Sequence, residues 1–497
     1  MADPPARPLL RLLKRGALLL LLVLATILAV RAHDAFRGPP LPPWLAMAPE
    51  EARADAIDAM GWAQWQAEEA RLFSEVAADL ARELRPGDRI PQNRFWAESP
   101  VNPARLSRDW NRSFTLAPTG PARGAVVLLH GLTDGPYSLR HIAFFYQARG
   151  FHVVAPRMPG HGTVPGGLTN VSLDQWQATA RLAMREARAR SGGGPIHLVG
   201  YSNGAAIALR HALAALADPG LARPARIILI SPMIGVSPAA RLAGVAAWPS
   251  LLPAFANAAW LDRTAEFNPF KYNSFPAHAA VLSERQTAAL SRELDAARGA
   301  GRLGDLPPIL AFQSVVDATV SAEAVQQRLF DRLPAGGHEL FLFDVNHQGL
   351  AAPLLTAGAR DAAAAFLPRA PRAYATALLT NAGLPEGQVV MRRWPEGSNI
   401  PAETPVEAAY PIALFSLSHV ALPFPPSDGL YGLEPDPADN QGAQLGRLAV
   451  HGERGAIAVS QDTLTRASSN PFFALMLQRM ADGLAGESPA PRLEPAP

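Results

Sequence analysis

The sequence predicts an α/β fold, in which buried parallel strands alternate with helices. The first indication is a series of short, mainly apolar runs without the alternation of apolar and polar residues that a half-exposed strand shows. These runs lie at residues 125–129, 151–155, 196–199, 227–230 and 309–312. The second indication is that segments of helical length and spacing separate them, such as residues 173–189 and 205–217. Strands that are apolar on both faces are buried between helix layers, so we expect a mostly parallel central sheet with helices on both faces.

Composition and charge narrow the classes of function. The chain has 497 residues, of which 48% are hydrophobic and 18% charged, so it has enough apolar material for a large core. Its 45 basic and 43 acidic residues leave a net charge of +2. A balance this close to neutral does not favour nucleic acid as a partner.

The residue types that are missing restrict the chemistry. Cysteine is absent, which excludes disulfides, thiol catalysis and cysteine-ligated metals. No His-Glu-x-x-His pattern or cluster of carboxylates supports a metal site, and we expect neither a metal nor another cofactor. Lysine occurs only at positions 14 and 271, which we interpret as a compositional bias.

Residues 1–37 have the features of an export or anchoring signal. An apolar run at residues 16–30 ends before Arg31 and follows the basic residues Arg7, Arg11, Lys14 and Arg15. We expect an uncleaved N-terminal membrane helix, with a cleaved secretory signal and a buried helix as alternatives. The positive flank would keep the N-terminus inside, so the rest of the protein would face the non-cytoplasmic side, the periplasm if the protein is bacterial.

Residues 38–113 are expected to form a linker and an N-terminal helical region. The stretch 38–43 is rich in proline, which favours a stiff spacer. Residues 49–85 carry apolar side chains at helical spacing, including Trp62 and Trp65, and we expect these helices to pack over a core. The remaining residues, 114–497, form the predicted α/β domain.

A serine with glycines on both sides follows the third apolar run. The run at 196–199 leads into Gly200-Tyr201-Ser202-Asn203-Gly204, and a helical segment begins at once. A strand that turns abruptly into a helix holds such a serine in a strained conformation, and only glycine avoids clashes at the flanking positions. The turn presents the serine hydroxyl at the N-terminus of the helix. We therefore predict that Ser202 is a nucleophile.

A serine that attacks an acyl group needs hydrogen-bond donors for the oxyanion of the tetrahedral intermediate. In a strand-turn-helix arrangement the donors are backbone amides, and one comes from the residue after the serine, Asn203. The other comes from the loop after an earlier strand, where we select Leu132. We expect His130 to shape that loop, because the base should follow the serine in the sequence.

Three segments together resemble the α/β-hydrolase superfamily, in particular its monoacylglycerol-lipase and serine-aminopeptidase-like branch. They are His130-Gly131-Leu132, Pro159-Gly160-His161-Gly162-Thr163 and Gly200-Tyr201-Ser202-Asn203-Gly204. The resemblance covers roughly residues 114–350. It implies an α/β-hydrolase fold, an esterase or lipase activity, Ser202 as the nucleophile and a carboxylate after a later strand. We expect His161 to brace the turn that contains it.

Asp317 is the predicted acid of the site. It follows the apolar run at 309–312 and precedes a helical segment that begins near residue 321. A carboxylate at this position would fix the tautomer of a histidine and balance the imidazolium that forms during attack. Helix capping is the alternative role for Asp317, and Asp344 is a weaker candidate for the acid.

Two histidines compete for the role of general base. His347 follows a strand at 339–345 and stands thirty residues after Asp317, which is the usual layout. However, the chain continues with further β-type runs that need a sheet to join, at 374–379, 388–391 and 410–416. The last run leads into Ser418-His419-Val420-Ala421-Leu422-Pro423-Phe424, which is similar to the segment that bears the base in monoacylglycerol-lipase-like enzymes. We favour His419 and keep His347 as the alternative, so that the residues after 348 form an extended C-terminal region.

The segment between the fourth and fifth runs, about residues 233–305, is rich in aromatic residues and proline and is too long for a simple connection. We expect a cap over the strand ends, with plain surface packing as the alternative. The combined features predict a membrane-anchored serine hydrolase that cleaves carboxylic esters through an acyl-enzyme, with monoacyl lipids as the candidate substrates. The alternatives are an acyltransferase with the same triad and a non-catalytic scaffold of α/β-hydrolase fold.

Overall fold

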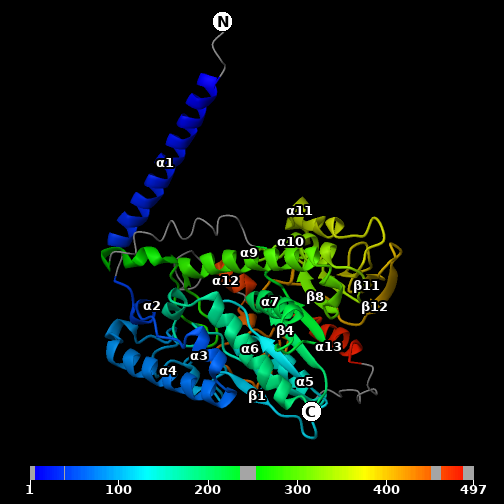
Figure 1. Ribbon diagram of the computed structural model, residues 1–497, viewed down its shortest axis with the longest axis horizontal. Helices are drawn as coiled ribbons and strands as arrows, with labels where there is room; N and C mark the ends of the chain where they lie inside the picture. The colour runs from blue at the N-terminus through cyan, green and yellow to red at the C-terminus, as the bar shows by residue number, and fades with distance from the viewer. Residues whose placement is uncertain (1–5, 38–39, 236–252, 449–459, 485–497) are drawn as a thin grey trace.

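The computed structural model describes residues 6–37, 40–235, 253–448 and 460–484. A ten-stranded sheet forms the centre of the molecule (Figure 1), with the order β1-β3-β2-β4-β5-β8-β9-β10-β11-β12. Every pair from β3 to β10 is parallel, whereas β1, β11 and β12 join antiparallel at the two edges. The predicted mostly parallel sheet is therefore confirmed.

The five apolar runs form the central strands β2, β3, β4, β5 and β8. The strands of the sheet are β1 (Phe114–Leu116), β2 (Gly124–Leu129), β3 (Phe151–Ala155), β4 (Ile196–Tyr201), β5 (Arg226–Ile230), β8 (Ile309–Ser314), β9 (Glu339–Phe343), β10 (Ala375–Thr380), β11 (Val389–Trp394) and β12 (Ala402–Val406). The helices that the structure describes in this domain are α5 (Arg140–Gln147), α6 (Leu173–Arg190), α7 (Asn203–Ala217), α9 (Ala277–Gly299), α10 (Ala322–Arg328), α11 (Ala357–Arg360), α12 (Gln461–Arg466) and α13 (Phe473–Asp482).

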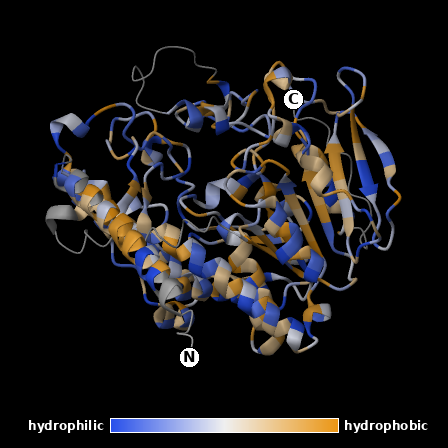
Figure 2. Ribbon diagram, turned by 90° about the horizontal axis from the view of Figure 1, so that it is seen from above, coloured by the Kyte–Doolittle hydropathy of each residue, from blue (hydrophilic) through white to orange (hydrophobic). Residues whose placement is uncertain are grey.

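Hydrophobic cores lie on both faces of the sheet. Val126 and Leu128 of β2 face the core that contains residues of α5 and α13, whereas Val127 and Leu129 face the core that contains residues of α6. Successive side chains of a strand point to opposite faces, so a strand covered on both faces must be apolar throughout. The hydropathy colouring shows the inner strands as largely hydrophobic (Figure 2).

The N-terminal helical region packs on the α/β domain. Ile57 of α3 (Ala54–Ala59) and the two tryptophans Trp62 and Trp65 of α4 (Trp62–Glu83) are buried in the core that also holds α6. The proline-rich stretch leads directly into α2 (Pro43–Ala46), where Trp44 is buried; residues 38 and 39 lie outside the described residues. Residues 40–113 are thus part of the body of the molecule.

A buried ion-pair network joins this region to the sheet. Arg157, which follows β3, donates two hydrogen bonds to the carboxylate of Glu51 (2.6 and 3.0 Å) and one to that of Glu69 (2.8 Å). The Arg157 side chain is 1% exposed, and each carboxylate side chain is 3% exposed. The Glu51 carboxylate also accepts a hydrogen bond from the backbone amide of Gly160 (2.6 Å). Buried charges are tolerated only when they are paired, so each member of the network depends on the others.

We expect Arg157→Met to lower the free energy of unfolding by about 3–5 kcal/mol, because the substitution leaves two buried carboxylates without their cation. The matched control is Arg181→Met, which removes an ion pair between α6 and Asp58 that is about one-third exposed. This control should cost at most about 1 kcal/mol, as is typical of surface pairs. Urea denaturation of both variants is the measurement, and equal losses would contradict the structural role assigned to Arg157.

The segment between β5 and β8 contains α9 and a small two-stranded sheet of β6 (Trp260–Asp262) and β7 (Phe275–Pro276). α9 packs along α7 on the face of the sheet that α6 also covers. Residues 236–252, which include Trp248 of the expected cap, lie outside the described residues. Several described residues of the segment line the cavity of the candidate active site.

The C-terminal region extends the sheet beyond β9. β10 and β11 correspond to the runs at 374–379 and 388–391. Residues 410–416, all of them described, form turns, so the strand predicted there is wrong. The carbonyls of Ile412 and Phe415 accept hydrogen bonds from the backbone amides of Leu350 and Asn346. These bonds attach the segment to the loop after β9 instead of to an edge of the sheet.

The N-terminal helix α1 (Ala6–Arg37) projects from the body of the molecule (Figure 1), and the side chains of Leu18, Leu19, Leu20, Leu21 and Leu22 are exposed. Among the described ranges, no helix meets both the length and the apolarity that crossing a membrane requires. The apolar run between Arg15 and Arg31 has 15 residues, fewer than the roughly 20 of a full span. The membrane helix predicted for residues 1–37 is not confirmed, and neither is the localisation inferred from it.

Candidate active site

Ser202 occupies a sharp turn between β4 and α7. Its backbone has φ 54° and ψ −116°, a conformation that side-chain-bearing residues rarely adopt. A Cβ atom on Gly204 would lie 2.0 Å from the carbonyl oxygen of Leu129, and one on Gly200 would lie 2.4 Å from the Cα of Ala205. The close approach of β4, α7 and β2 therefore requires glycine on both sides of the serine. This agrees with the inference from the sequence that only glycine avoids clashes at these two positions.

Asp317 and His419 form a hydrogen-bonded pair. The Nδ1 atom of His419 lies 2.9 Å from Oδ2 of Asp317, and the two side chains are 5% and 0% exposed. The other carboxylate oxygen of Asp317 accepts hydrogen bonds from the backbone amides of Thr319 (2.8 Å) and Val320 (3.0 Å). Gln313 also donates to Oδ2 (3.1 Å). These contacts fix the carboxylate at the end of β8 and leave Nε2 as the imidazole nitrogen that does not face it.

The surroundings of Asp317 favour its ionised form. Burial alone would raise the pKa of Asp317, but the adjacent His419 and the backbone amides outweigh burial and lower it below its ordinary value of 3.8. A carboxyl whose folded pKa is lowered stabilises the fold fully above the ordinary value and loses this contribution as the pH falls through the folded value.

We expect Asp317→Asn to cost about 1–3 kcal/mol of unfolding free energy at neutral pH, because it removes a charge-assisted hydrogen bond inside the protein. The difference between wild type and variant should shrink only when the pH falls below 3.8, the ordinary value for the group. Urea denaturation at a series of pH values measures it. A difference that already disappears in mildly acidic buffer would contradict a lowered pKa.

Ser202 and His419 line the same cavity, which has a volume of about 460 Å³. Gly131 and Leu132, from the loop after β2, also line it, and a Cβ atom on Gly131 would lie 3.1 Å from the Cβ of Ser202. Asn203 begins α7 directly after the serine. The assignment of the Leu132 and Asn203 amides as oxyanion donors stays a prediction, and this close packing is compatible with it.

His347 belongs to a different environment. Its Nε2 atom lies 3.2 Å from the carboxylate of Asp344, and its backbone amide donates to the side chain of Asn381. The carboxylate of Asp344 also accepts a hydrogen bond from the hydroxyl of Thr380 (2.7 Å). The two alternatives from the sequence, His347 and Asp344, are thus each other's partners, whereas Asp317 and His419 meet at the cavity that holds Ser202.

His130 and His161, from two of the segments that resemble the α/β-hydrolases, are also buried. Nδ1 of His130 lies 2.9 Å from the carbonyl oxygen of Gly131, and its Nε2 accepts a hydrogen bond from the backbone amide of Met158 (2.9 Å). Burial lowers the pKa of His130 to about 4, so the ring is neutral at physiological pH. Nδ1 of His161 lies 3.0 Å from the carbonyl oxygen of Pro159. The bond between Met158 and His130 connects the loops after β3 and β2, and the His161 bond braces the turn within the loop after β3.

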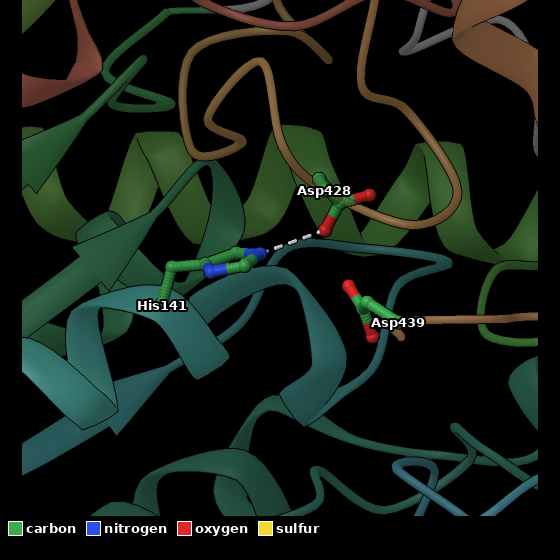
Figure 3. Close-up of side chains that lie close together, drawn as sticks. All are labelled: His141, Asp428 and Asp439. Carbon is green, nitrogen blue, oxygen red and sulfur yellow. Dashed lines mark hydrogen bonds and ion pairs between the residues drawn. The ribbon is translucent and has the colours of Figure 1, made fainter. Parts of the chain in front are cut away.

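His141, Asp428 and Asp439 approach one another closely enough to suggest metal ligands (Figure 3). The guanidinium of Arg140, however, contacts both carboxylates, and its Nη2 lies 2.7 Å from Asp428. Asp428 also accepts hydrogen bonds from the hydroxyl of Tyr137 and from two backbone amides. A cation of the protein thus already neutralises the carboxylates, and the cluster serves to hold the C-terminal region against α5.

Sequence reasoning missed two groups that lie close to Ser202, Asp317 or His419. Gln313 supports Asp317 from within β8, and no local pattern marks it. Lys271 lines the cavity, whereas the sequence alone suggests only that lysine is rare in this chain because of a compositional bias. The signal that pointed to Lys271 was its position as the single lysine outside the N-terminal segment.

The mostly parallel sheet and the strained turn at Ser202 are features of the α/β-hydrolase fold. Residues 120–348 match the family model described as serine aminopeptidase, S33. A segment of 63 residues is 36% identical to the thermostable monoacylglycerol lipase of Bacillus sp. (strain H-257) and covers 13% of this chain. That match spans 24% of the length of the lipase.

Solved structures with a similar arrangement include lipolytic enzymes. One comes from work on LipS and LipT, two metagenome-derived lipolytic enzymes, with 23% identity over 48% of this chain and 89% of the other, and a TM-score of 0.39. Another is the monoacylglycerol lipase of Paleococcus ferrophilus, with 20% identity over 46% of this chain and 87% of the other, and a TM-score of 0.35.

Proposed function

We propose that the protein is a serine hydrolase that cleaves carboxylic esters through an acyl-enzyme intermediate. The observation that carries the proposal is the convergence of a strained serine and a buried Asp-His pair on one cavity. This is the constellation that activates a serine hydroxyl. The match of residues 120–348 to the serine aminopeptidase, S33, family model supports the same chemistry.

Each residue has a distinct role in the proposed reaction. His419 takes the proton of the Ser202 hydroxyl at Nε2 while Oγ attacks the ester carbonyl, and Asp317 balances the imidazolium through Nδ1. The amides of Leu132 and Asn203 bind the oxyanion. His419 then returns the proton to the departing alcohol, and the acyl group stays on Ser202. Water, deprotonated by His419, attacks the acyl-enzyme, and the acid leaves as His419 returns the proton to Oγ of Ser202.

Monoacyl lipids are the proposed substrates. Leu132, Met233, Phe275, Val320 and Val420 give the cavity an apolar part of its lining, which suits an acyl chain. The similarity to a monoacylglycerol lipase favours the same class.

The test is hydrolysis of 4-nitrophenyl esters and monoacylglycerols of graded chain length, with the released acid quantified. We expect turnover by the wild type and none above background by Ser202→Ala. Ester formation with an added alcohol in excess of free acid would identify an acyltransferase. A folded wild-type protein that hydrolyses none of the esters and reacts with no fluorophosphonate would contradict the proposal and favour a scaffold.

A further inference from the structure

The candidate active site contains a lysine that the reaction described above does not use. Lys271 lines the same cavity as Ser202 and His419 and is partly buried. Its side chain forms no ion pair or hydrogen bond with any residue in the part of the chain that the structure describes. The ammonium group is therefore available to the contents of the cavity.

The loop that carries Lys271 is held rigidly. The carboxylate of Glu266 accepts hydrogen bonds from the backbone amides of Asn273 (3.0 Å) and Ser274 (2.8 Å), which closes the loop. Inside it, the side-chain oxygen of Asn268 accepts from the backbone amide of Lys271 itself (3.1 Å). Glu266 and Asn268 are at most 3% exposed, so water competes little for these bonds.

Hydrogen bonds to other parts of the chain fix the loop relative to the rest of the site. The buried guanidinium of Arg94 donates to the carbonyl of Asn268 (3.1 Å) and contacts that of Lys271 (3.5 Å). The backbone amide of Tyr272 donates to the carbonyl of Thr133 (2.7 Å), which belongs to the loop that carries the proposed oxyanion donor Leu132. Lys271 is thus anchored to the same framework as the proposed catalytic groups, and such support is typical of a group that recognises a ligand.

The charges around Lys271 leave its ammonium incompletely neutralised. Asp134 is the buried carboxyl of the cavity, and its oxygen accepts a hydrogen bond from the amide of Gly135 (3.1 Å). In the described ranges it makes no ion pair with Lys271. The other carboxylates of the lining, Asp262 and Asp462, are exposed to solvent, which screens them. A second cation, Arg466, also faces the cavity and bonds to the hydroxyl of Thr319.

We propose that Lys271 is a specificity-determining residue that binds an anionic group, a carboxylate or a phosphate, on the ester substrate. The proposal rests on the proposed function, since it names the substrate class of the same site. A partly buried ammonium without a hydrogen-bonded counterion is destabilised, and a substrate anion supplies such a counterion. Burial and the nearby Arg466 lower the pKa of Lys271 and Asp134 opposes them, so a bound anion would act in the same direction as Asp134.

Two pairs of esters test the proposal and distinguish the two sides of the scissile bond. The first pair, mono(4-nitrophenyl) glutarate and its neutral methyl ester, places the anion on the acyl side. The second pair, a monoacylglycerol 3-phosphate and the matching monoacylglycerol, places it on the alcohol side. The variants are Lys271→Met and Lys271→Arg. The control is Arg292→Met, which removes an exposed positive charge of α9 that does not line the cavity.

We expect the wild type to prefer the anionic member of at least one pair, and Lys271→Met to lower kcat/KM for that ester by about 10-fold or more, in line with the loss of one charge-assisted hydrogen bond. For the neutral member the change should stay within about threefold, Lys271→Arg should retain part of the preference, and Arg292→Met should retain all of it. A preference that is absent in the wild type, or that survives unchanged in Lys271→Met, overturns the proposal while the esterase function stands.

A binding measurement makes the proposal independent of turnover. The Ser202→Ala variant should show a rise in Tm with millimolar glutarate or glycerol 3-phosphate, and the added Lys271→Met substitution should remove it. Equal Tm shifts in both backgrounds, or no shift in either, overturn the proposal. An anion-dependent shift that requires Lys271 in a protein that hydrolyses no ester would support the anion site and reject only the proposed function.

Discussion

Ser202→Ala is expected to lower kcat for ester hydrolysis by about 10⁴-fold or more, because the variant has no atom that can carry the acyl group. The substitution removes a single oxygen, so the fold should be preserved, as circular dichroism can verify. The measurement is the initial rate of 4-nitrophenyl ester hydrolysis at saturating substrate.

Ser231→Ala is the matched control for this variant. Ser231 also has a positive φ, of 44°, is buried, and follows the neighbouring strand β5. It does not line the cavity, so its removal should change kcat by no more than about threefold. Comparable losses in the two variants would show that strain in the turns, and not a nucleophilic hydroxyl, determines the rate.

His419→Ala is expected to lower kcat by about 10³- to 10⁴-fold, because Ser202 then has no base. His347→Ala should change kcat by at most about threefold, because His347 pairs with Asp344 and not with Asp317. In this variant Asp344 still accepts the hydrogen bond from the hydroxyl of Thr380. The two variants remove the same side chain from two polar environments, a buried one at His419 and a partly buried one at His347. If His347→Ala abolished turnover and His419→Ala did not, the base would have to be reassigned.

The parts of the fold that depend on local pattern were predictable from the sequence. Mainly apolar runs without alternation identified β2, β3, β4, β5 and β8, because strands covered on both faces need apolar residues on both. The glycines at 200 and 204 identified the turn at Ser202, because a Cβ atom at either position would meet backbone atoms.

Features that depend on distant partners were not predictable in this way. The segment 410–416 has a strand-like composition, but its hydrogen bonds go to the loop after β9. Spacing alone favoured His347 as the partner of Asp317, and only the resemblance of residues 418–424 to a known motif pointed to His419, which the structure brings in from 102 residues away. Likewise, the bond between His141 and Asp428 joins residues 287 positions apart, and Lys271 reaches the cavity through a loop whose anchors come from the N-terminal region and α/β domain.

The most direct test of the account is the site of reaction of a fluorophosphonate probe, determined by mass spectrometry of the wild-type protein after proteolysis. We predict one adduct per chain, on the peptide that contains Ser202, with slower labelling in Asp317→Asn and His419→Ala. An adduct on any other residue, or none on a folded protein, would contradict the activation of Ser202 by the Asp317-His419 pair.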